Sequence, residues 1–134
     1  MSHKDHIQIL QDYKNINKVP SHLVPSTMLY GFINQEIVGR LSIRHFLNEN
    51  LQKRGGHIGY SVSPLHRRKG YAKEMFKQGL EYCRHLGLKK ILITCSDENE
   101  PSWKIIESFN AVLENKIYDE VDEEVIRRYW LEIT

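Results

Sequence analysis

The segment with the clearest hydrophobic pattern lies in the middle of the chain. Across residues 72–86, apolar positions recur at spacings of three and four, while charged and amide side chains occupy the opposite face. That period predicts an amphipathic helix, and Gly87 is typical of the residue that ends one. Residues 57–62 alternate like a half-buried strand, and residues 89–95 enclose a continuous apolar run that suits a strand covered on both sides. Strand, helix and strand in this order predict a parallel βαβ unit with a right-handed crossover.

Shorter patterned segments flank this unit on both sides. Residues 1–25 show no sustained period and predict an irregular lead-in, in which residues 6–11 fit either a short helix or a strand. No internal repeat or domain boundary is found, so we expect residues 1–134 to form one domain of the mixed α/β class. The other expected elements are a hairpin with strands 26–33 and 36–46, a loop over 48–56, a short helix beginning near Pro101, and a closing antiparallel hairpin with strands 111–118 and 125–133.

Composition narrows the class of protein. The chain has 134 residues, of which 40% are hydrophobic and 27% charged, as in one globular domain with its own core. A net charge of +2 is too small to indicate a nucleic-acid partner. No run approaches the roughly 20 apolar residues that span a bilayer, and the first residues lack the apolar core of a signal peptide. We therefore expect no membrane segment and a cytoplasmic protein.

The two cysteines, Cys83 and Cys95, lack the CxxC spacing of zinc and redox sites. Both lie in apolar patterns, which favours buried reduced thiols over a disulfide. We therefore expect no metal site.

A basic, glycine-containing turn connects the strand at 57–62 to the central helix. Residues 67–72 read RRKGYA. The first N–H groups of a helix have no partner inside it and carry the positive end of the helix dipole, so this turn can bind an anion. The sequence predicts a phosphorylated ligand here, and a basic surface turn before an ordinary helix is the alternative.

The turn resembles the acyl-CoA pyrophosphate loop of the GNAT superfamily of N-acetyltransferases, whose pattern is Gln/Arg-x-x-Gly-x-Gly/Ala. Arg67, Gly70 and Ala72 fall on its defined positions, and the order of elements on both sides fits, so the resemblance covers residues 26–134. It implies a twisted, mainly antiparallel sheet with a parallel βαβ pair at the cofactor cleft and helices on both faces. Residues 56–60 and 128–130 also look like a group of bacterial GNAT acetyltransferases with no assigned substrate.

The resemblance implies acetyl-CoA as the acyl-donor cosubstrate. In GNAT proteins the strand before the loop splays from the strand after the helix, and the pantetheine arm inserts between them like an extra strand. Asn99 and Ser102 match positions that often contact this arm or the thioester, and helix capping is their alternative role. The cofactor contacts implied by the resemblance come from Val62, through its backbone, and from Arg67, Arg68, Lys69, Gly70, Tyr71, Ala72, Asn99 and Ser102.

The implied reaction is direct attack of an amine on the thioester, which requires proton transfers. An amine with a pKa near ~10 must lose a proton, and the leaving thiolate gains one. Many family members supply that proton from a tyrosine seven residues beyond the asparagine that matches Asn99, but Ile106 occupies this position and leaves the general acid unassigned. His57 shares a strand face with Gly59 and Ser61 and is the candidate base, a structural or exposed histidine being the alternative.

We therefore expect an N-acetyltransferase that moves an acetyl group from acetyl-CoA to a primary amine of a small molecule or peptide. A non-catalytic CoA-binding or regulatory module is the first alternative, and a small nucleic-acid-binding protein using residues 66–69 is the second. GNAT domains normally begin with a strand and one or two helices that roof the acceptor site, and residues 1–25 are short for all of them. The roof is reduced, or a neighbouring subunit completes it in a homodimer, or the chain is a truncated form. No motif identifies the acceptor.

Overall fold

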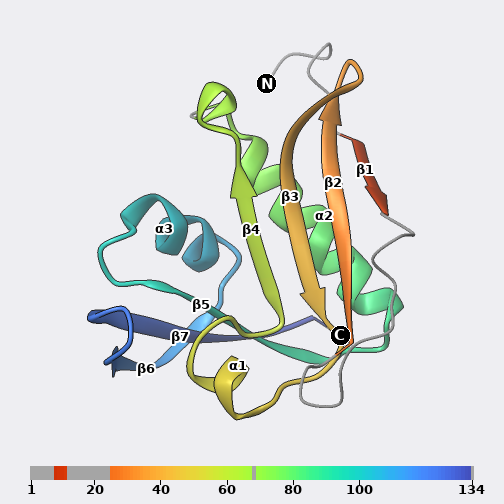
Figure 1. The fold of residues 1–134 in the computed structure, drawn as a ribbon. Coiled ribbons are helices and arrows are strands. Elements are labelled where there is room, and N and C mark those ends of the chain that lie inside the picture. Colours follow the sequence, from red (N-terminus) through yellow and green to blue (C-terminus); the bar gives the residue numbers. More distant parts are fainter. Residues whose placement is uncertain (1–7, 12–24, 68, 134) are drawn as a thin grey trace.

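The computed structural model describes residues 8–11, 25–67 and 69–133. They form two antiparallel sheets, one with strand order β1-β2-β3-β4 and one with strand order β5-β7-β6. Figure 1 shows helix α2 along one face of the first sheet, helix α3 beside β4, and the second sheet crossing the lower end of the first. The elements are β1 (Gln8–Gln11), β2 (Ser26–Ile33), β3 (Glu36–Arg44), α1 (Glu49–Lys53), β4 (Ile58–Val62), a 3-10 turn (Pro64–His66), α2 (Tyr71–His85), β5 (Lys90–Ser96), α3 (Glu100–Ser108), β6 (Val112–Asp119) and β7 (Glu124–Glu132).

The mixed α/β class and both antiparallel hairpins are confirmed. Strands β2 and β3 join at Asn34 and Gln35, whose φ angles of 49° and 72° are left-handed, as a tight hairpin turn requires. Strands β6 and β7 pair from Val112 to Asp119 along the predicted closing hairpin. Of the irregular lead-in predicted for residues 1–25, residues 8–11 form a strand that pairs with β2, and residues 1–7 and 12–24 lie outside the described residues.

The loop predicted over residues 48–56 is wrong in part, because it contains α1. The Asn48 side chain caps this helix by accepting a hydrogen bond from the Leu51 N–H at 2.9 Å. The helix has five residues and none of them is buried, so it leaves no hydrophobic period in the sequence. A cap without an amphipathic pattern is too weak a signal to distinguish a short helix from a loop.

Helix α2 is held firmly against the first sheet. Its side chains Met75, Phe76 and Cys83 are completely buried, as the period of three and four predicts. A Cβ at Gly79 would lie only 2.7 Å from the Ile58 side chain, so glycine allows the helix to approach β4 closely. Burial of a side chain the size of Met or Phe contributes about 1.5–3 kcal/mol. This packing fixes the N-terminus of α2 beside the end of β4.

The two strands of the βαβ unit, β4 and β5, approach each other only near His57 and Leu92. The His57 N–H donates to the Leu92 carbonyl at 2.8 Å, and the ladder partner of β5 is β7 rather than β4. The expected parallel pair is therefore reduced to a contact between these two residues, and β4 and β5 splay apart beyond it. Gly56, with φ of 61°, permits the approach, because a Cβ there would collide with the Leu92 carbonyl oxygen.

Cys83 is buried and Cys95 partly buried, and both are free thiols. Within residues 8–11, 25–67 and 69–133, no cluster of three or more His, Cys, Asp or Glu side chains has the arrangement of a metal site. None of the helices in the described part of the chain is both long and apolar enough to cross a bilayer.

Candidate active site

The N-terminus of α2 begins on a glycine in the left-handed region. Gly70 is the N-cap residue, with φ of 80° and ψ of 4°, and among the described residues no atom beyond its chain neighbours lies within 4 Å of the position that a Cβ would take. The Tyr71 side chain is only 4% exposed and packs in the core, with its ring centroid 6.3 Å from that of His66 in the preceding turn. The space over the first N–H groups of α2 is therefore open to an anion.

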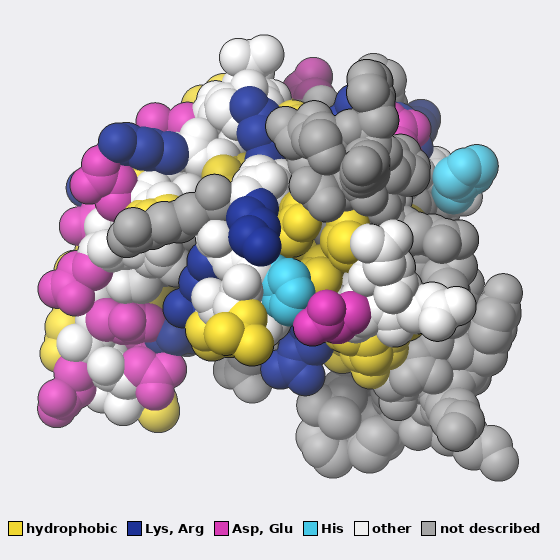
Figure 2. Space-filling view, turned by 90° about the horizontal axis from the view of Figure 1, so that it is seen from above, with side chains coloured by type: hydrophobic (Ala, Val, Ile, Leu, Met, Phe, Trp, Pro, Cys, Tyr) yellow, Lys and Arg dark blue, Asp and Glu magenta, His cyan; other side chains and the backbone are white. Residues whose placement is uncertain are grey.

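Basic side chains accompany this helix N-terminus. Arg67 and Lys69 are exposed, Ala72 is half-buried, and Arg68 lies outside the described residues. The Arg67 Nε donates to the Val62 carbonyl at 3.2 Å, which ties the loop to the end of β4. Figure 2 looks down on this end of the molecule and shows Lys and Arg side chains near the middle of the face, with Asp and Glu side chains gathered toward the side of α3, β6 and β7.

The outer edge of β4 has no strand partner among the described residues, although the Val62 carbonyl at its end accepts from Arg67. The Ser63 N–H donates to Val38 at 2.8 Å, and the His57 carbonyl accepts from Arg44 at 2.7 Å, so the odd-numbered residues of this strand face β3. The backbone groups of residues 58, 60 and 62 alternate with them and point to the opposite edge. Among the described residues, no strand pairs with β4 on that edge. An amide-containing chain can add there as an extra strand.

The splay of β4 from β5 leaves a cleft of about 410 Å³. Asn99 and Ser102 line it from the first turn of α3, where the Asn99 side chain caps the helix by accepting from the Ser102 N–H at 3.3 Å. Asn99 therefore both caps α3 and lines the cleft. Other lining residues are Ile58, Gly59 and Tyr60 of β4, Thr94, Cys95 and Ser96 of β5, and Arg44, Arg54, Gly55, Glu124 and Ile126 around them.

The geometry of His57 opposes the base role predicted for it. The side chain is 6% exposed instead of facing the open side with Gly59 and Ser61. Its Nδ1 accepts a hydrogen bond from the Leu92 N–H at 2.9 Å, so the neutral ring carries its proton on Nε2 and has no free lone pair. His57 thus hydrogen-bonds to both the carbonyl and the N–H of Leu92 and joins β4 to β5 at the point from which the two strands diverge.

This burial predicts a pH dependence of stability. Desolvation lowers the pKa of His57 from its ordinary 6.5, so the unfolded chain binds a proton more readily than the folded one. The free energy of unfolding that depends on His57 is present above pH 6.5 and falls as the pH drops from there through the lower pKa of the folded state, by up to about 1.4 kcal/mol per pH unit. Urea unfolding between pH 4.5 and 8 checks this. The variant His57→Asn keeps an acceptor for the Leu92 N–H, and an equally steep acid loss in that variant would contradict the assignment.

The cleft contains a hydroxyl pair that sequence reasoning missed. The Tyr60 hydroxyl lies 3.0 Å from the Ser102 hydroxyl, and the bond spans the cleft from β4 to α3. Burial raises the pKa of the Tyr60 phenol, and the hydrogen bond with Ser102 offsets part of the rise. In the sequence Tyr60 is one of several aromatic positions on a strand face, so no local signal separates it from a core residue.

Cys95 lines the same cleft as a protonated thiol. Burial raises its pKa to about 11, and its hydrogen bond with Ser102 acts in the opposite direction. A thiol with this pKa is almost entirely protonated at neutral pH, whereas the thiolate is the nucleophile. The environment therefore opposes covalent catalysis through Cys95.

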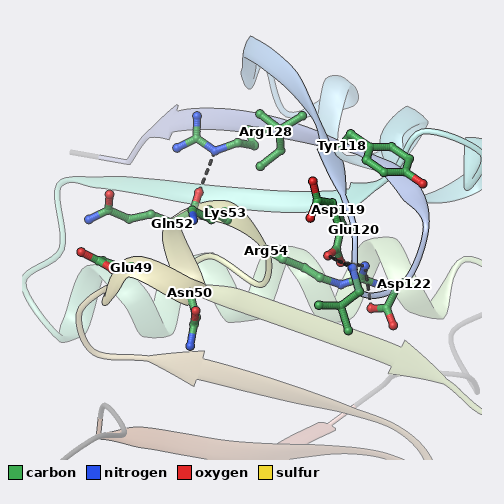
Figure 3. A pocket seen from close by; sticks show the side chains of 12 residues that line it. Glu49, Asn50, Gln52, Lys53, Arg54, Tyr118, Asp119, Glu120, Asp122 and Arg128 are labelled. Carbon is green, nitrogen blue, oxygen red and sulfur yellow. Dashed lines mark hydrogen bonds and ion pairs between the residues drawn. The ribbon is translucent and has the colours of Figure 1, made fainter.

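A second depression of about 1140 Å³ lies between α1 and the turn of the β6–β7 hairpin. Figure 3 shows Arg54 reaching toward the acidic residues of this turn. Its Nη1 lies 2.7 Å from Asp119 and 2.9 Å from Asp122, and its Nη2 lies 2.5 Å from Glu124. The hydrogen bond from Arg54 lowers the pKa of the Asp119 carboxyl. Arg54 also lines the cleft, so the two hollows adjoin there.

The aromatic and basic residues near the C-terminus divide between the two faces of β7. Tyr129 is 1% exposed, and its hydroxyl donates to Glu107 at 2.5 Å and accepts from Arg127 at 3.0 Å. Arg128 lines the depression beside α1. The residues of this strand therefore anchor α3 on one face and approach the second depression on the other.

A βαβ unit whose strands splay apart around a cleft, with a glycine at the N-terminus of its helix, is the arrangement that the resemblance to GNAT acetyltransferases implies. Residues 3–110 match the family model described as the acetyltransferase (GNAT) family. The chain belongs to this family.

The relatives extend beyond the length of this chain. YnaD of Bacillus subtilis (strain 168), an uncharacterized N-acetyltransferase, is 30% identical over 71 residues, which are 52% of this chain and 39% of YnaD. YncA of Salmonella typhimurium, solved with its cofactor acetyl-CoA, superposes with a TM-score of 0.65 at 14% identity, covering 81% of this chain and 65% of YncA.

Two further solved structures have the same fold. The ribosomal-protein-S5-alanine acetyltransferase of Vibrio fischeri gives a TM-score of 0.68 at 16% identity, covering 81% of this chain and 62% of that one. Mutant forms of the spermidine/spermine N-acetyltransferase SpeG of Vibrio cholerae give 0.67 at 18% identity, covering 80% and 64%. At these identities the structures establish the fold alone, and the chain spans less than two-thirds of each relative.

Proposed function

We propose that the protein is an acetyl-CoA-dependent N-acetyltransferase that acts on a primary amine of a small molecule or peptide by direct attack on the thioester. The observation that carries the proposal is the glycine-capped N-terminus of α2, which follows β4 in the chain, together with the cleft between β4 and β5. Family membership supports the same reaction class.

The residues present fit acetyl-CoA. Backbone N–H groups of the first turn of α2, together with Arg67 and Lys69, are suited to its pyrophosphate, because they combine a helix N-terminus with flexible cations. The neighbouring Arg68 remains a predicted contact. The outer edge of β4, which has no strand partner among the described residues, is suited to the amide-containing pantetheine arm, and Asn99 and Ser102 lie on the opposite wall. When bound, the cosubstrate supplies an activated acetyl thioester.

The edge of β4 also supports the chemistry. A backbone N–H aimed into the cleft near Val62 would stabilise the negative charge that develops on the acetyl oxygen. The acceptor amine would approach from the side of α1 and the β6–β7 turn, where the second depression adjoins the cleft at Arg54. Because the neutral His57 ring has no free lone pair, we assign removal of the amine proton to water.

The test is acetyl transfer to a panel of amines, followed as thiol release from acetyl-CoA, alongside calorimetric titration of acetyl-CoA and of a duplex oligonucleotide. The proposal predicts micromolar binding of acetyl-CoA, thiol release with at least one amine, and no binding of the oligonucleotide. Binding without release across the panel would favour the non-catalytic CoA-binding module, which the burial of Ile106 keeps as a second candidate. Absence of acetyl-CoA binding would contradict both.

We further propose a homodimer and a cytoplasmic location. A homodimer would complete the acceptor site if the segment before β2 forms only part of the roof, and sedimentation of the purified protein tests it. Cytoplasmic location is the second, and cell fractionation tests it.

Replacing Arg67 by alanine is expected to raise the dissociation constant for acetyl-CoA about tenfold, because one charge-assisted contact to phosphate is lost. Calorimetric titration measures it. Lys77→Ala is the matched control, since Lys77 is an exposed cation on the same helix beyond its first turn. Equal weakening in both variants would contradict a specific role for Arg67.

A further inference from the structure

The proposed reaction needs a proton donor for the leaving thiolate, and α3 does not provide one at the position where a tyrosine is expected. Ile106 there has no acid function, and its side chain is completely buried instead of lining the cleft. Ser102 lies one turn earlier on the same face of the helix and does line the cleft. A donor must therefore come from another wall of the cleft.

We propose that Tyr60 of β4, hydrogen-bonded across the cleft to Ser102 of α3, is the general acid that protonates the thiolate of CoA as it leaves. This inference rests on the proposed acetyl-transfer function. The general acid would then lie on β4 instead of α3. The outer edge of the same strand would hold the pantetheine arm.

Contacts with Phe76 and Ser102 hold the Tyr60 side chain in place. Its ring packs edge-on against Phe76 of α2, with centroids 5.5 Å apart and an interplanar angle of 61°. Its hydroxyl lies 3.0 Å from the Ser102 hydroxyl, which also bonds to the Cys95 thiol. The backbone of Tyr60 faces the unpaired edge of β4, so its side chain and its main chain both border the space between the splayed strands.

The chemistry of the neighbouring groups favours Tyr60 as the donor. Burial raises the pKa of its phenol, which keeps the hydroxyl protonated at neutral pH. A serine hydroxyl is far less acidic than a phenol, and the Cys95 thiol is a weak hydrogen-bond donor. Ser102 therefore acts as the group that orients the Tyr60 hydroxyl.

The proposed step is balanced in protons and electrons. The amine nitrogen forms a bond to the acetyl carbon while the carbon–sulfur bond breaks, and the sulfur keeps the electron pair. The sulfur takes the proton of the Tyr60 hydroxyl. Water returns a proton to the phenolate, and the extra proton on the acylated nitrogen leaves to water, so free CoA and the N-acetyl product are the only net products.

The test compares Tyr60→Phe with the wild type and with Tyr82→Phe. Tyr60→Phe keeps the ring that packs on Phe76 and removes only the hydroxyl. Tyr82 is the matched control, because it is a half-buried tyrosine of α2 whose hydroxyl donates to Thr27 at 3.4 Å and does not line the cleft.

The first readout needs no acceptor amine. The thiol of bound CoA is titrated by its thiolate absorbance, and a parallel titration with bound desulfo-CoA, which lacks the thiol, is subtracted to remove the signals of Cys83 and Cys95. A phenol that donates to the sulfur stabilises the thiolate, so the pKa of the bound thiol is expected to be about one unit lower in the wild type and Tyr82→Phe than in Tyr60→Phe. Desulfo-CoA is expected to bind all three proteins with the same dissociation constant.

The second readout applies to any amine that the wild type acetylates. The kcat of Tyr60→Phe is expected to fall about tenfold or more, with the KM for acetyl-CoA unchanged. An unchanged thiol pKa in Tyr60→Phe would overturn the inference while leaving the proposed function in place. Failure of the wild type to bind CoA would overturn both.

Discussion

Replacing Gly70 by aspartate is expected to raise the dissociation constant for acetyl-CoA about 100-fold. The carboxylate would stand at the N-cap of α2, beside the N–H groups of the first turn, where no described atom beyond the chain neighbours of Gly70 lies within 4 Å of the Cβ position. It would repel the pyrophosphate and compete for the same donors, and a loss of about 2.7 kcal/mol of binding free energy corresponds to this factor. Calorimetric titration with acetyl-CoA measures it.

Gly87→Asp is the matched control for this variant. Gly87 follows the other end of α2, has φ of 86° and likewise has no described atom beyond its chain neighbours within 4 Å of its Cβ position. Both substitutions therefore introduce the same left-handed strain, about 1 kcal/mol of stability. Comparable stability with normal acetyl-CoA affinity in Gly87→Asp assigns the loss to the anion site, and equal loss of affinity in both variants would contradict it.

Replacing His57 by alanine is expected to lower the free energy of unfolding by about 2–3 kcal/mol. The substitution leaves the Leu92 N–H without its acceptor in a part of β5 that is completely buried, and it removes a packed ring at the root of the splay. Urea unfolding at pH 7.5 measures the change, since His57 is neutral in both states there.

Two control variants distinguish the loss of the hydrogen bond to Leu92 from the loss of side-chain packing. His57→Asn retains an acceptor for the Leu92 N–H and is expected to lose less than half as much stability as the alanine variant. His85→Ala removes an exposed histidine at the end of α2 and is expected to change stability by less than about 0.5 kcal/mol. A His57→Ala protein as stable as the wild type would show that the Leu92 contact does not hold the strands together.

The sequence predicts well the features that a few consecutive residues determine. The helix at α2 follows from its apolar period, the β2–β3 hairpin from its two-residue turn, and the glycine-containing turn before α2 from residues 67–72. Each depends on local backbone conformation or on a local period, both of which can be read from one window of the chain.

The remaining features depend on how distant segments meet. The βαβ order predicts adjacent strands, but the angle between β4 and β5 depends on the pairing of β5 with β7 and on the junction of His57 with Leu92. The same junction buries the histidine that strand alternation places on an open face. Tyr60 becomes a candidate acid only because α3 brings Ser102 to its hydroxyl from 42 residues further along the chain.

Binding of acetyl-CoA at the N-terminus of α2 and along the outer edge of β4 is central to the proposed function. Amide hydrogen exchange with and without acetyl-CoA tests this most directly. We expect slower exchange in peptides covering residues 58–62 and 70–74 and unchanged exchange in the turn between β6 and β7. Unchanged exchange in the first two segments at saturating acetyl-CoA, or protection confined to other parts of the chain, would contradict it.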